Sequence, residues 1–176
     1  LSNFIIYSDF FLELPAKYPE IDFVFRPHPL LFITLKTSDI WGEEKTNDYL
    51  KKITSYINVE YQEGGDYFDT FINSDGIIHD CSSFIVEYLF TGNPACYLLR
   101  NKEFLDKYFV SLGKNCLNNY YMAFNESDII AFIENVVIKE EDTLFTERVN
   151  YVKKNLMLNY PNVSDKIIEH IKDCLV

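Results

Sequence analysis

The segment 75–94 constrains the fold of this 176-residue chain more than any other part of it. It opens with a short apolar run, 76–79, bounded by residues typical of turns, and this pattern predicts a buried strand. The polar residues that follow, Asp80, Ser82 and Ser83, are favoured helix N-caps. A helix is therefore expected to start at Ser82 or Ser83, where free N–H groups and the positive end of the helix dipole would suit an anion.

The exit from that helix predicts a return to the sheet. Gly92 and Pro94 should end the helix, and 95–99 reads as the next buried strand. In a doubly wound sheet, ligands bind where such a strand meets the following helix. The segment therefore predicts both a parallel sheet and the place of its site.

The rest of the chain alternates in the same way, which predicts an α/β fold: a Rossmann-like parallel sheet with helices on both faces. Helices are expected at 4–18, about 47–57, 67–73, 82–92, 102–108, 125–137, 143–158 and 164–175. Strands are expected at 21–25, 59–61, 76–79, 95–99 and 120–123. The pattern over 30–45 is unclear, and 111–119 reads as a loop.

Length and composition predict one domain over 1–176, closed by helices at about 143–175. Because the chain begins Leu1-Ser2, without an initiator Met, we expect it to be a piece of a longer protein. The formal net charge of −11 argues against non-specific nucleic-acid binding, which needs clustered Lys and Arg. Four cysteines without zinc or CxxC spacing favour a reducing cytoplasm. There is no signal peptide or membrane-length apolar run in the sequence.

The first candidate site is the loop Arg26-Pro27-His28-Pro29, which follows an expected strand. Two prolines hold this loop extended and rigid. A histidine there can donate to a phosphate or exchange protons near neutral pH, and Arg26 can hold a phosphate bidentately. The alternative is structural: His28 satisfied by backbone carbonyls, and Arg26 in an ion pair.

The second candidate site is the turn with Asp80, Ser82 and Ser83, whose adjacent hydroxyls could contact a diphosphate. Glu87 follows Ser83 by four residues on the same side of the expected helix, where it could accept from ribose hydroxyls. The alternatives are plain helix capping and a solvated glutamate. We expect His79 to be a hydrogen-bonded core histidine. The sequence has no Gly-x-Ser-x-Gly elbow, P-loop or Gly-x-Gly-x-x-Gly, and its carboxylates do not cluster like metal ligands.

Taken together, these motifs resemble two groups of transferases. Ser83-x-x-x-Glu87-x-x-x-x-Gly92-x-Pro94 resembles the donor-binding signature of nucleotide-sugar transferases with the GT-B fold. The basic-x-His-Pro loop at 26–29, together with the turn at 80–83, resembles the CDP-glycerol glycerophosphotransferase family, the teichoic-acid polymerases and their capsule or wall relatives. The segment 162–168 is similar to that family's closing helix, so the resemblance runs from about Asp22 to the end. Cys81 stands where that family has Tyr, and Glu87-Tyr88 stands where many polymerases have Phe-Asp.

The resemblance implies the C-terminal, donor-binding domain of a two-domain GT-B transferase. His28 would be catalytic, Arg26, Asp80, Ser82 and Ser83 would bind the donor phosphates, and Glu87 would bind the ribose.

It further implies transfer of polyol phosphate from CDP-glycerol, or a related nucleotide-activated donor, to a cell-wall or capsule polymer, without a cofactor or tightly bound metal. A polysaccharide or glycolipid acceptor would bind mainly to the missing N-terminal domain, and membrane association would come only through the rest of the protein. We expect a cytoplasmic location, extending to the inner face of the membrane for the full-length protein. Two alternatives stay open: a UDP-sugar glycosyltransferase or epimerase-like GT-B domain, and a non-catalytic binding module.

Overall fold

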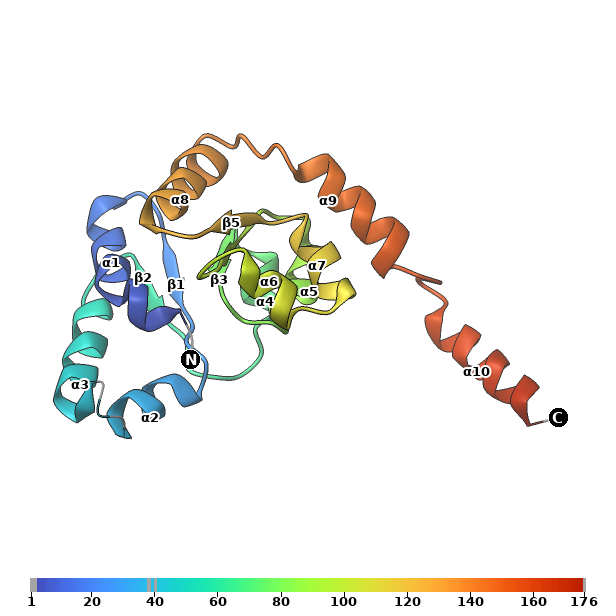
Figure 1. Cartoon of the computed structure of the whole chain (residues 1–176), viewed down its shortest axis with the longest axis horizontal. Helices are drawn as coiled ribbons and strands as arrows, with labels where there is room; N and C mark the ends of the chain where they lie inside the picture. The colour runs from blue at the N-terminus through green and yellow to red at the C-terminus, as the bar shows by residue number, and fades with distance from the viewer. Residues whose placement is uncertain (1–2, 38, 40, 176) are drawn as a thin grey trace. The chain divides into compact units, whose positions relative to one another are not determined.

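The chain forms an α/β structure in which every paired strand runs parallel to its neighbour in the part of the chain that the structure describes. The computed structural model describes residues 3–37, 39 and 41–175 (Figure 1). Its contacts divide the chain into two compact units, Leu1–Asp69 and Thr70–Val176. The α/β class and the parallel strands are therefore confirmed, whereas one domain over 1–176 stays a prediction.

The first unit contains a two-stranded parallel sheet and three helices. Its elements are α1 (Phe4–Lys17), β1 (Phe23–Phe25), α2 (Leu30–Thr37), α3 (Gly42–Ile53) and β2 (Val59–Tyr61). Strands β1 and β2 pair with Val24 opposite Glu60. The side chain of Asn58, just before β2, donates to the backbone carbonyls of Pro15, Tyr18 and Ile21. It therefore fixes the connection from α1 to β1.

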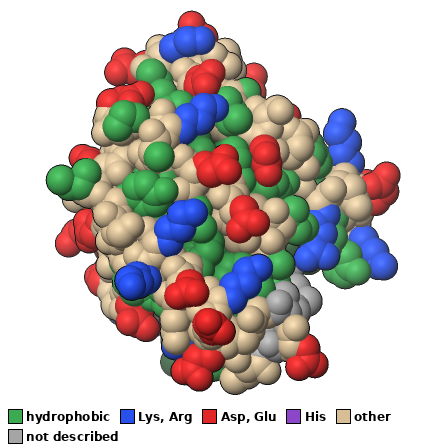
Figure 2. Space-filling view, turned by 90° about the vertical axis from the view of Figure 1, so that its left-hand side faces the viewer, with side chains coloured by type: hydrophobic (Ala, Val, Ile, Leu, Met, Phe, Trp, Pro, Cys, Tyr) green, Lys and Arg blue, Asp and Glu red, His purple; other side chains and the backbone are tan. Residues whose placement is uncertain are grey.

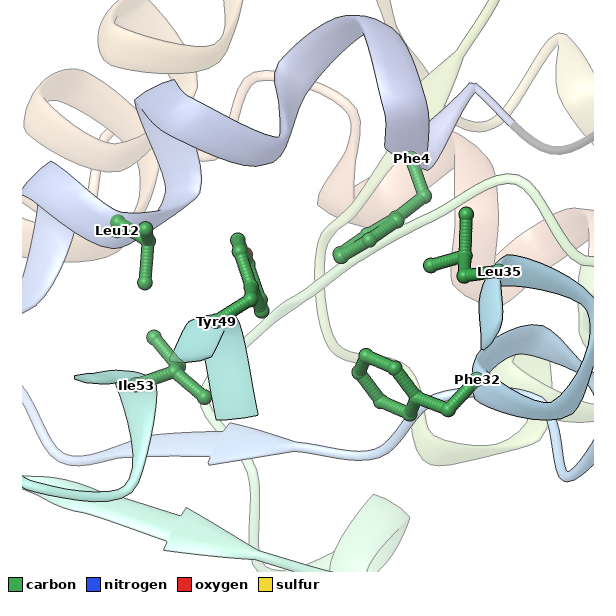
Figure 3. Close-up of a cluster of buried hydrophobic side chains, with 6 residues drawn as sticks. All are labelled: Phe4, Leu12, Phe32, Leu35, Tyr49 and Ile53. Carbon is green, nitrogen blue, oxygen red and sulfur yellow. The ribbon is translucent and has the colours of Figure 1, made fainter. Parts of the chain in front are cut away.

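An aromatic core holds the three helices of this unit together. Six buried side chains, two from each helix, point toward one another (Figure 3): Phe4, Leu12, Phe32, Leu35, Tyr49 and Ile53. The Tyr49 ring packs edge-on against Phe4 at 5.4 Å between ring centroids, and its hydroxyl donates to the backbone carbonyl of Ser8. Buried tyrosines generally keep such a partner for the hydroxyl, so the core satisfies its own polar atom.

The second unit contains a three-stranded parallel sheet with the order β3-β4-β5. The strands are β3 (Ile77–His79), β4 (Ala95–Leu98) and β5 (Tyr121–Ala123). All residues of the central strand β4 are buried, as expected for a parallel strand covered on both faces. Parallel pairing brings the carboxyl ends of all three strands to one edge.

Helices connect and extend this sheet. The α-helices are α4 (Phe68–Ile72), α5 (Phe84–Glu87), α6 (Glu103–Tyr108), α7 (Ser111–Leu117), α8 (Glu126–Ala131), α9 (Phe145–Tyr151) and α10 (Val163–Cys174). A 3₁₀ segment, η1 (Tyr88–Thr91), continues α5, and π-helical segments η2 (Phe132–Ile138) and η3 (Val152–Leu156) continue α8 and α9. The expected helix starts near Asn101 and Asn125 are confirmed, because both side chains accept a backbone N–H of the next turn.

Several element predictions were wrong. The strands form two separate sheets among the described residues instead of one. The segment expected as a loop at 111–119 contains α7, because Cys116 and Leu117 gain burial there despite Gly113. Helix α3 spans Gly42–Ile53, so it begins about five residues before the helix expected at about 47–57.

The last helix differs most from expectation. Both closing helices were expected to pack an apolar face on a sheet, and α9 with η3 does bury Arg148 and Val152. In α10, however, no residue is buried, and Ile167, Ile168 and Ile171 are each about half exposed. An amphipathic pattern predicts a helix but not the surface that covers it.

A buried arginine ties α9 to the sheet. The Arg148 side chain is fully buried; its Nε donates to the Gly92 carbonyl at 2.9 Å, and its guanidinium pairs with the carboxylate of Asp142. Asp142 also accepts from the Tyr121 hydroxyl of β5. The polar network therefore joins β5, the turn after η1 and α9.

No helix in the described part of the chain combines the length and apolar character needed to cross a membrane.

Candidate functional site

The turn that follows β3 exposes two adjacent hydroxyls at the carboxyl edge of the second sheet. Ser82 and Ser83 are exposed, whereas Asp80 and Cys81 are partly buried. Ser83 stands at the N-cap position of α5, but its hydroxyl does not cap the helix; it lies 3.1 Å from the Cys81 sulfur. The Ser83 side chain therefore does not cap the helix, which was the structural alternative for this residue. Both Ser82 and Ser83 are exposed to solvent.

Helix α5 is shorter than the sequence predicts, and its short length limits the helix dipole that could attract an anion at its N-terminus. Only the four residues of α5 are α-helical before the 3₁₀ segment η1, which ends at Gly92 in the left-handed region (φ +78°). A macrodipole needs several aligned peptides, so hydroxyls and side-chain charges must supply most of any anion binding at this turn. Glu87 ends α5 and is partly buried, and its role as a ribose contact stays a prediction.

Two tyrosines fix the backbone of the turn at both ends. The Tyr97 hydroxyl, from β4, donates to the Asp80 carbonyl at 3.1 Å. The Tyr120 hydroxyl, just before β5, donates to the Ile85 carbonyl at 2.9 Å. Burial raises the pKa of both phenols well above the ordinary value, so both remain donors at any physiological pH. The turn is therefore held by side chains that reach it from the neighbouring strands.

His79 lies beneath this turn, and the expectation for it was half right. The residue is buried, as expected, but neither ring nitrogen has a hydrogen-bond partner in the part of the chain that the structure describes. Burial lowers the pKa of His79 to about 3, and the nearby backbone of Cys81 opposes this only in part. The ring is therefore neutral at physiological pH.

The loop after β4 places two cationic side chains, Arg100 and Lys102, at the same edge of the sheet. Neither was among the site residues expected from the sequence. Arg100, Asn101 and Lys102 directly follow the central strand and are exposed. Since β4 pairs with β3 on one side, this loop and the turn at 80–83 leave adjacent strands at the same end. The signal was present in the sequence: two cations come within three residues after an expected buried strand.

The loop with His28 belongs to the first unit and begins helix α2. The Leu30 N–H donates to His28 Nδ1 at 3.1 Å, and the Leu31 N–H donates to the His28 carbonyl. His28 thus caps the start of α2 with its side chain, and Pro29 stands directly before the first helical residue. Because Nδ1 accepts, the proton of the neutral ring lies on Nε2, which is the nitrogen that can donate to a ligand.

Arg26 makes intramolecular contacts in the same unit. Its guanidinium donates to Gln62 Oε1 at 3.0 Å and to the Gly65 carbonyl, and it lies 5.5 Å from the centre of the Tyr67 ring. These contacts hold the glycine-containing loop after β2. Phosphate binding by Arg26 stays a prediction, and it would require this side chain to exchange or share these partners.

The thiols of the second unit divide by burial. Burial raises the pKa of Cys96 to about 12 and also raises the pKa of Cys116, so neither forms a thiolate nucleophile at neutral pH. Cys81 is the thiol that lies in the turn. Among residues 3–37, 39 and 41–175, no three His, Cys, Asp or Glu side chains are grouped to hold a metal ion.

Two surface hollows lie elsewhere in the second unit. One, of about 410 Å³, has a lining that includes Asn115 of α7, Asn118 directly after α7, and Tyr151 of α9. The other, of about 490 Å³, includes Met122, Asp128 and Phe132.

Comparison with protein-family models, with curated proteins and with solved structures finds no match to this chain.

Proposed function

We propose that this chain is the donor-binding part of a GT-B transferase that moves polyol phosphate, such as glycerol phosphate, from a CDP-activated donor to a cell-wall or capsule polymer. The observation that supports the proposal best is the exposed pair Ser82 and Ser83 at the carboxyl edge of a parallel sheet, next to the loop with Arg100 and Lys102. A diphosphate needs hydroxyl donors and cations together, and this edge offers both.

Each residue has a proposed role. The hydroxyls of Ser82 and Ser83 donate to phosphate oxygens, and Arg100 and Lys102 offset the negative charge that grows as the nucleotide monophosphate departs. Glu87 accepts hydrogen bonds from the ribose hydroxyls.

A catalytic role for His28, in the first unit, stays a prediction; its Nε2–H is the group that would donate to a ligand. Asp80 was expected to bind phosphate, but its carboxylate would repel phosphate oxygens; its proposed role is to hold the turn in place through its backbone carbonyl, which accepts from the Tyr97 hydroxyl. The residues assigned here bind the donor, and none of them is assigned to the acceptor or as a general base, so we expect the 176-residue chain to bind donor without turnover.

The test is isothermal titration calorimetry of the chain with CDP-glycerol, UDP-sugars and GDP-sugars. We expect CDP-glycerol to bind and the double variant Ser82→Ala/Ser83→Ala to bind at least about a hundredfold more weakly, because each of the two lost hydrogen bonds to a charged group costs about 1.5–3 kcal/mol. Ser164→Ala, an exposed serine on α10, is the matched control and should bind like the parent chain.

Two outcomes would contradict the proposal. Binding of UDP-sugars without CDP-glycerol would favour a nucleotide-sugar glycosyltransferase. No binding of any nucleotide at millimolar concentration would favour a non-catalytic binding module.

A further inference from the structure

The ring of His79 is surrounded by aromatic side chains from β4, from α5 and from the residue just before β5. Its centroid lies 5.2 Å from the Tyr97 ring, 5.6 Å from the Tyr120 ring and 6.1 Å from the Phe84 ring. The planes of His79 and Tyr97 meet at 88°, and those of His79 and Tyr120 at 66°, so both tyrosines pack edge to face with the imidazole. The histidine therefore contacts both tyrosines, whose own ring centroids lie 6.4 Å apart.

The same two tyrosines hold the backbone of the turn. Tyr97 bonds the carbonyl of Asp80 at its start, and Tyr120 bonds the carbonyls of Phe84 and Ile85 at its end. A displacement of the His79 ring would move both phenols, and with them both attachment points of the segment that carries Ser82 and Ser83.

An apolar ring would fill this space at lower cost. Only 8% of His79 is exposed, and both ring nitrogens lack a hydrogen-bond partner among the described residues. Burying unpaired polar atoms is unfavourable, and burying a charged imidazolium without a counter-ion is more so. The site therefore accepts the histidine only in its uncharged form.

We propose that His79 is a positioning residue whose uncharged ring keeps Tyr97 and Tyr120 bonded to the turn at 80–85, and that protonation of this ring releases the turn. This proposal stands independently of which ligand the turn binds.

Several titratable and charged groups lie near the aromatic rings around His79, and none of them reverses the lowering of the His79 pKa by burial. Asp80 and Cys81, in the turn, interact electrostatically with Tyr97 of β4. Cys116 of α7, Tyr88 of η1, Arg148 of α9 and Tyr97 interact with Tyr120. Glu87 lies on α5, the helix that carries Phe84. Burial dominates the ionisation of His79, so the closed turn excludes a proton that the opened turn binds.

The sign and size of the effect follow from this linkage. The pKa of the His79 ring is about 3 in the closed turn and returns to the ordinary 6.5 once the ring is solvated. Opening therefore becomes easier as the pH falls from 6.5 toward 3. Between pH 7.5 and 5.0 the opening equilibrium should increase about thirtyfold.

The experiment is amide hydrogen exchange, followed residue by residue by NMR, on the full chain and on His79→Phe. The probe is the Tyr88 amide, which donates to the Phe84 carbonyl, the same carbonyl that Tyr120 holds. The control probe is the Leu99 amide, which donates to Ala123 across the sheet. Dividing the parent rate by the His79→Phe rate at each pH removes the chemical pH dependence of exchange.

We expect the ratio for Tyr88 to rise about thirtyfold from pH 7.5 to pH 5.0 while the ratio for Leu99 stays constant. A Tyr88 ratio that changes less than twofold would overturn the proposal. So would a parallel rise at Leu99, because it would mean that the whole sheet opens.

A second variant tests the mechanical link without altering His79. Tyr97→Phe keeps the ring but removes the hydroxyl that holds Asp80, so Tyr88 exchange should accelerate about fivefold already at pH 7.5. Tyr108→Phe, at an exposed tyrosine of α6, is the matched control. Equal exchange in the two variants would show that the phenol does not position the turn.

Discussion

At the scale of single residues, the second unit depends on a buried ion pair that no sequence pattern singles out. Arg148 is fully buried, and the Asp142 side chain is only 14% exposed. Asp142 also accepts from the Tyr121 hydroxyl and the Leu144 N–H. Removal of Asp142 would therefore leave the buried, positively charged guanidinium of Arg148 without its counter-ion.

We predict that Asp142→Ala lowers the free energy of unfolding by about 3–5 kcal/mol, because an unpaired guanidinium stays buried. Urea denaturation followed by circular dichroism measures this loss. Glu141→Ala removes the exposed neighbouring carboxylate and should change stability by less than about 0.5 kcal/mol. Similar values for the two variants would mean that the pair adds nothing.

The residue types at the turn were predictable from sequence, whereas their partners were not. Asp80, Ser82 and Ser83 after a short apolar run predicted an exposed polar turn, and the serines are exposed. The tyrosine hydroxyls that hold the turn come from residues 17 and 35 positions away from their partners. Such contacts depend on strand order, which residue spacing does not encode.

At the scale of elements, the loop before α2 shows a structural role for a residue that the sequence analysis selected for chemistry. His28 caps α2 with its side chain, and Pro29, directly before the helix, has a fixed φ angle. A variant of His28 therefore changes helix stability as well as any ligand contact.

We predict that His28→Ala destabilises the chain by about 1 kcal/mol, through loss of the cap. His28→Asn keeps a capping oxygen and should recover most of that loss. Thermal denaturation of the two variants measures the difference. Donor binding should fall in both variants if Nε2–H contacts the ligand; weakening in the alanine variant alone would assign His28 a purely structural role.

The final helix offers the clearest comparison between pattern and packing. The amphipathic spacing over 164–175 correctly predicted a helix, and the structure has α10 at Val163–Cys174. Burial of its apolar face was predicted wrongly, because period and composition are the same for a helix that packs and for one that does not.

We predict that deleting residues 162–176 lowers the free energy of unfolding of the remaining chain by less than about 0.5 kcal/mol, because no α10 side chain is buried. Denaturant unfolding of the shortened chain measures this. Deletion from residue 145 onward, which also removes Arg148, is the contrasting control and should prevent stable folding of the second unit. A large loss from the shorter deletion would mean that α10 packs on the rest of the chain.

At the scale of the whole molecule, charge is the property with the clearest consequence. The formal net charge is −11, from 16 Lys and Arg against 27 Asp and Glu. Figure 2 shows a face on which basic side chains lie among acidic ones instead of forming a continuous basic stripe. Arg100 and Lys102, which follow β4, are therefore two cations on a chain whose net charge is strongly negative.

We predict a solubility minimum near pH 4.6, the isoelectric point, where self-repulsion vanishes. Light scattering across pH 4 to 8 measures it. Asp173→Lys, on exposed α10, should move the minimum to higher pH without altering the fold. An unchanged minimum in this variant would mean that local contacts, not net charge, drive association.

The fold class followed from alternation along the chain, but the division of the strands did not. Apolar runs correctly placed β2, β3, β4 and β5 to within one residue or so, since each run is short and bounded by turn residues. Division into two sheets depends on whether strands of three or four residues find hydrogen-bond partners, and the apolar pattern is the same in either case.

The position of Trp41 has a practical consequence for optical work. It is the sole tryptophan of the chain, and it packs in the first unit, 5.2 Å from the Tyr49 ring, with the Lys45 ammonium 4.9 Å from the indole. Its intrinsic fluorescence therefore reports selectively on the unit that carries Arg26 and His28. Emission quenched by an added nucleotide would signal an event there, whereas the 13 tyrosines lie in both units and their signal would not separate the two.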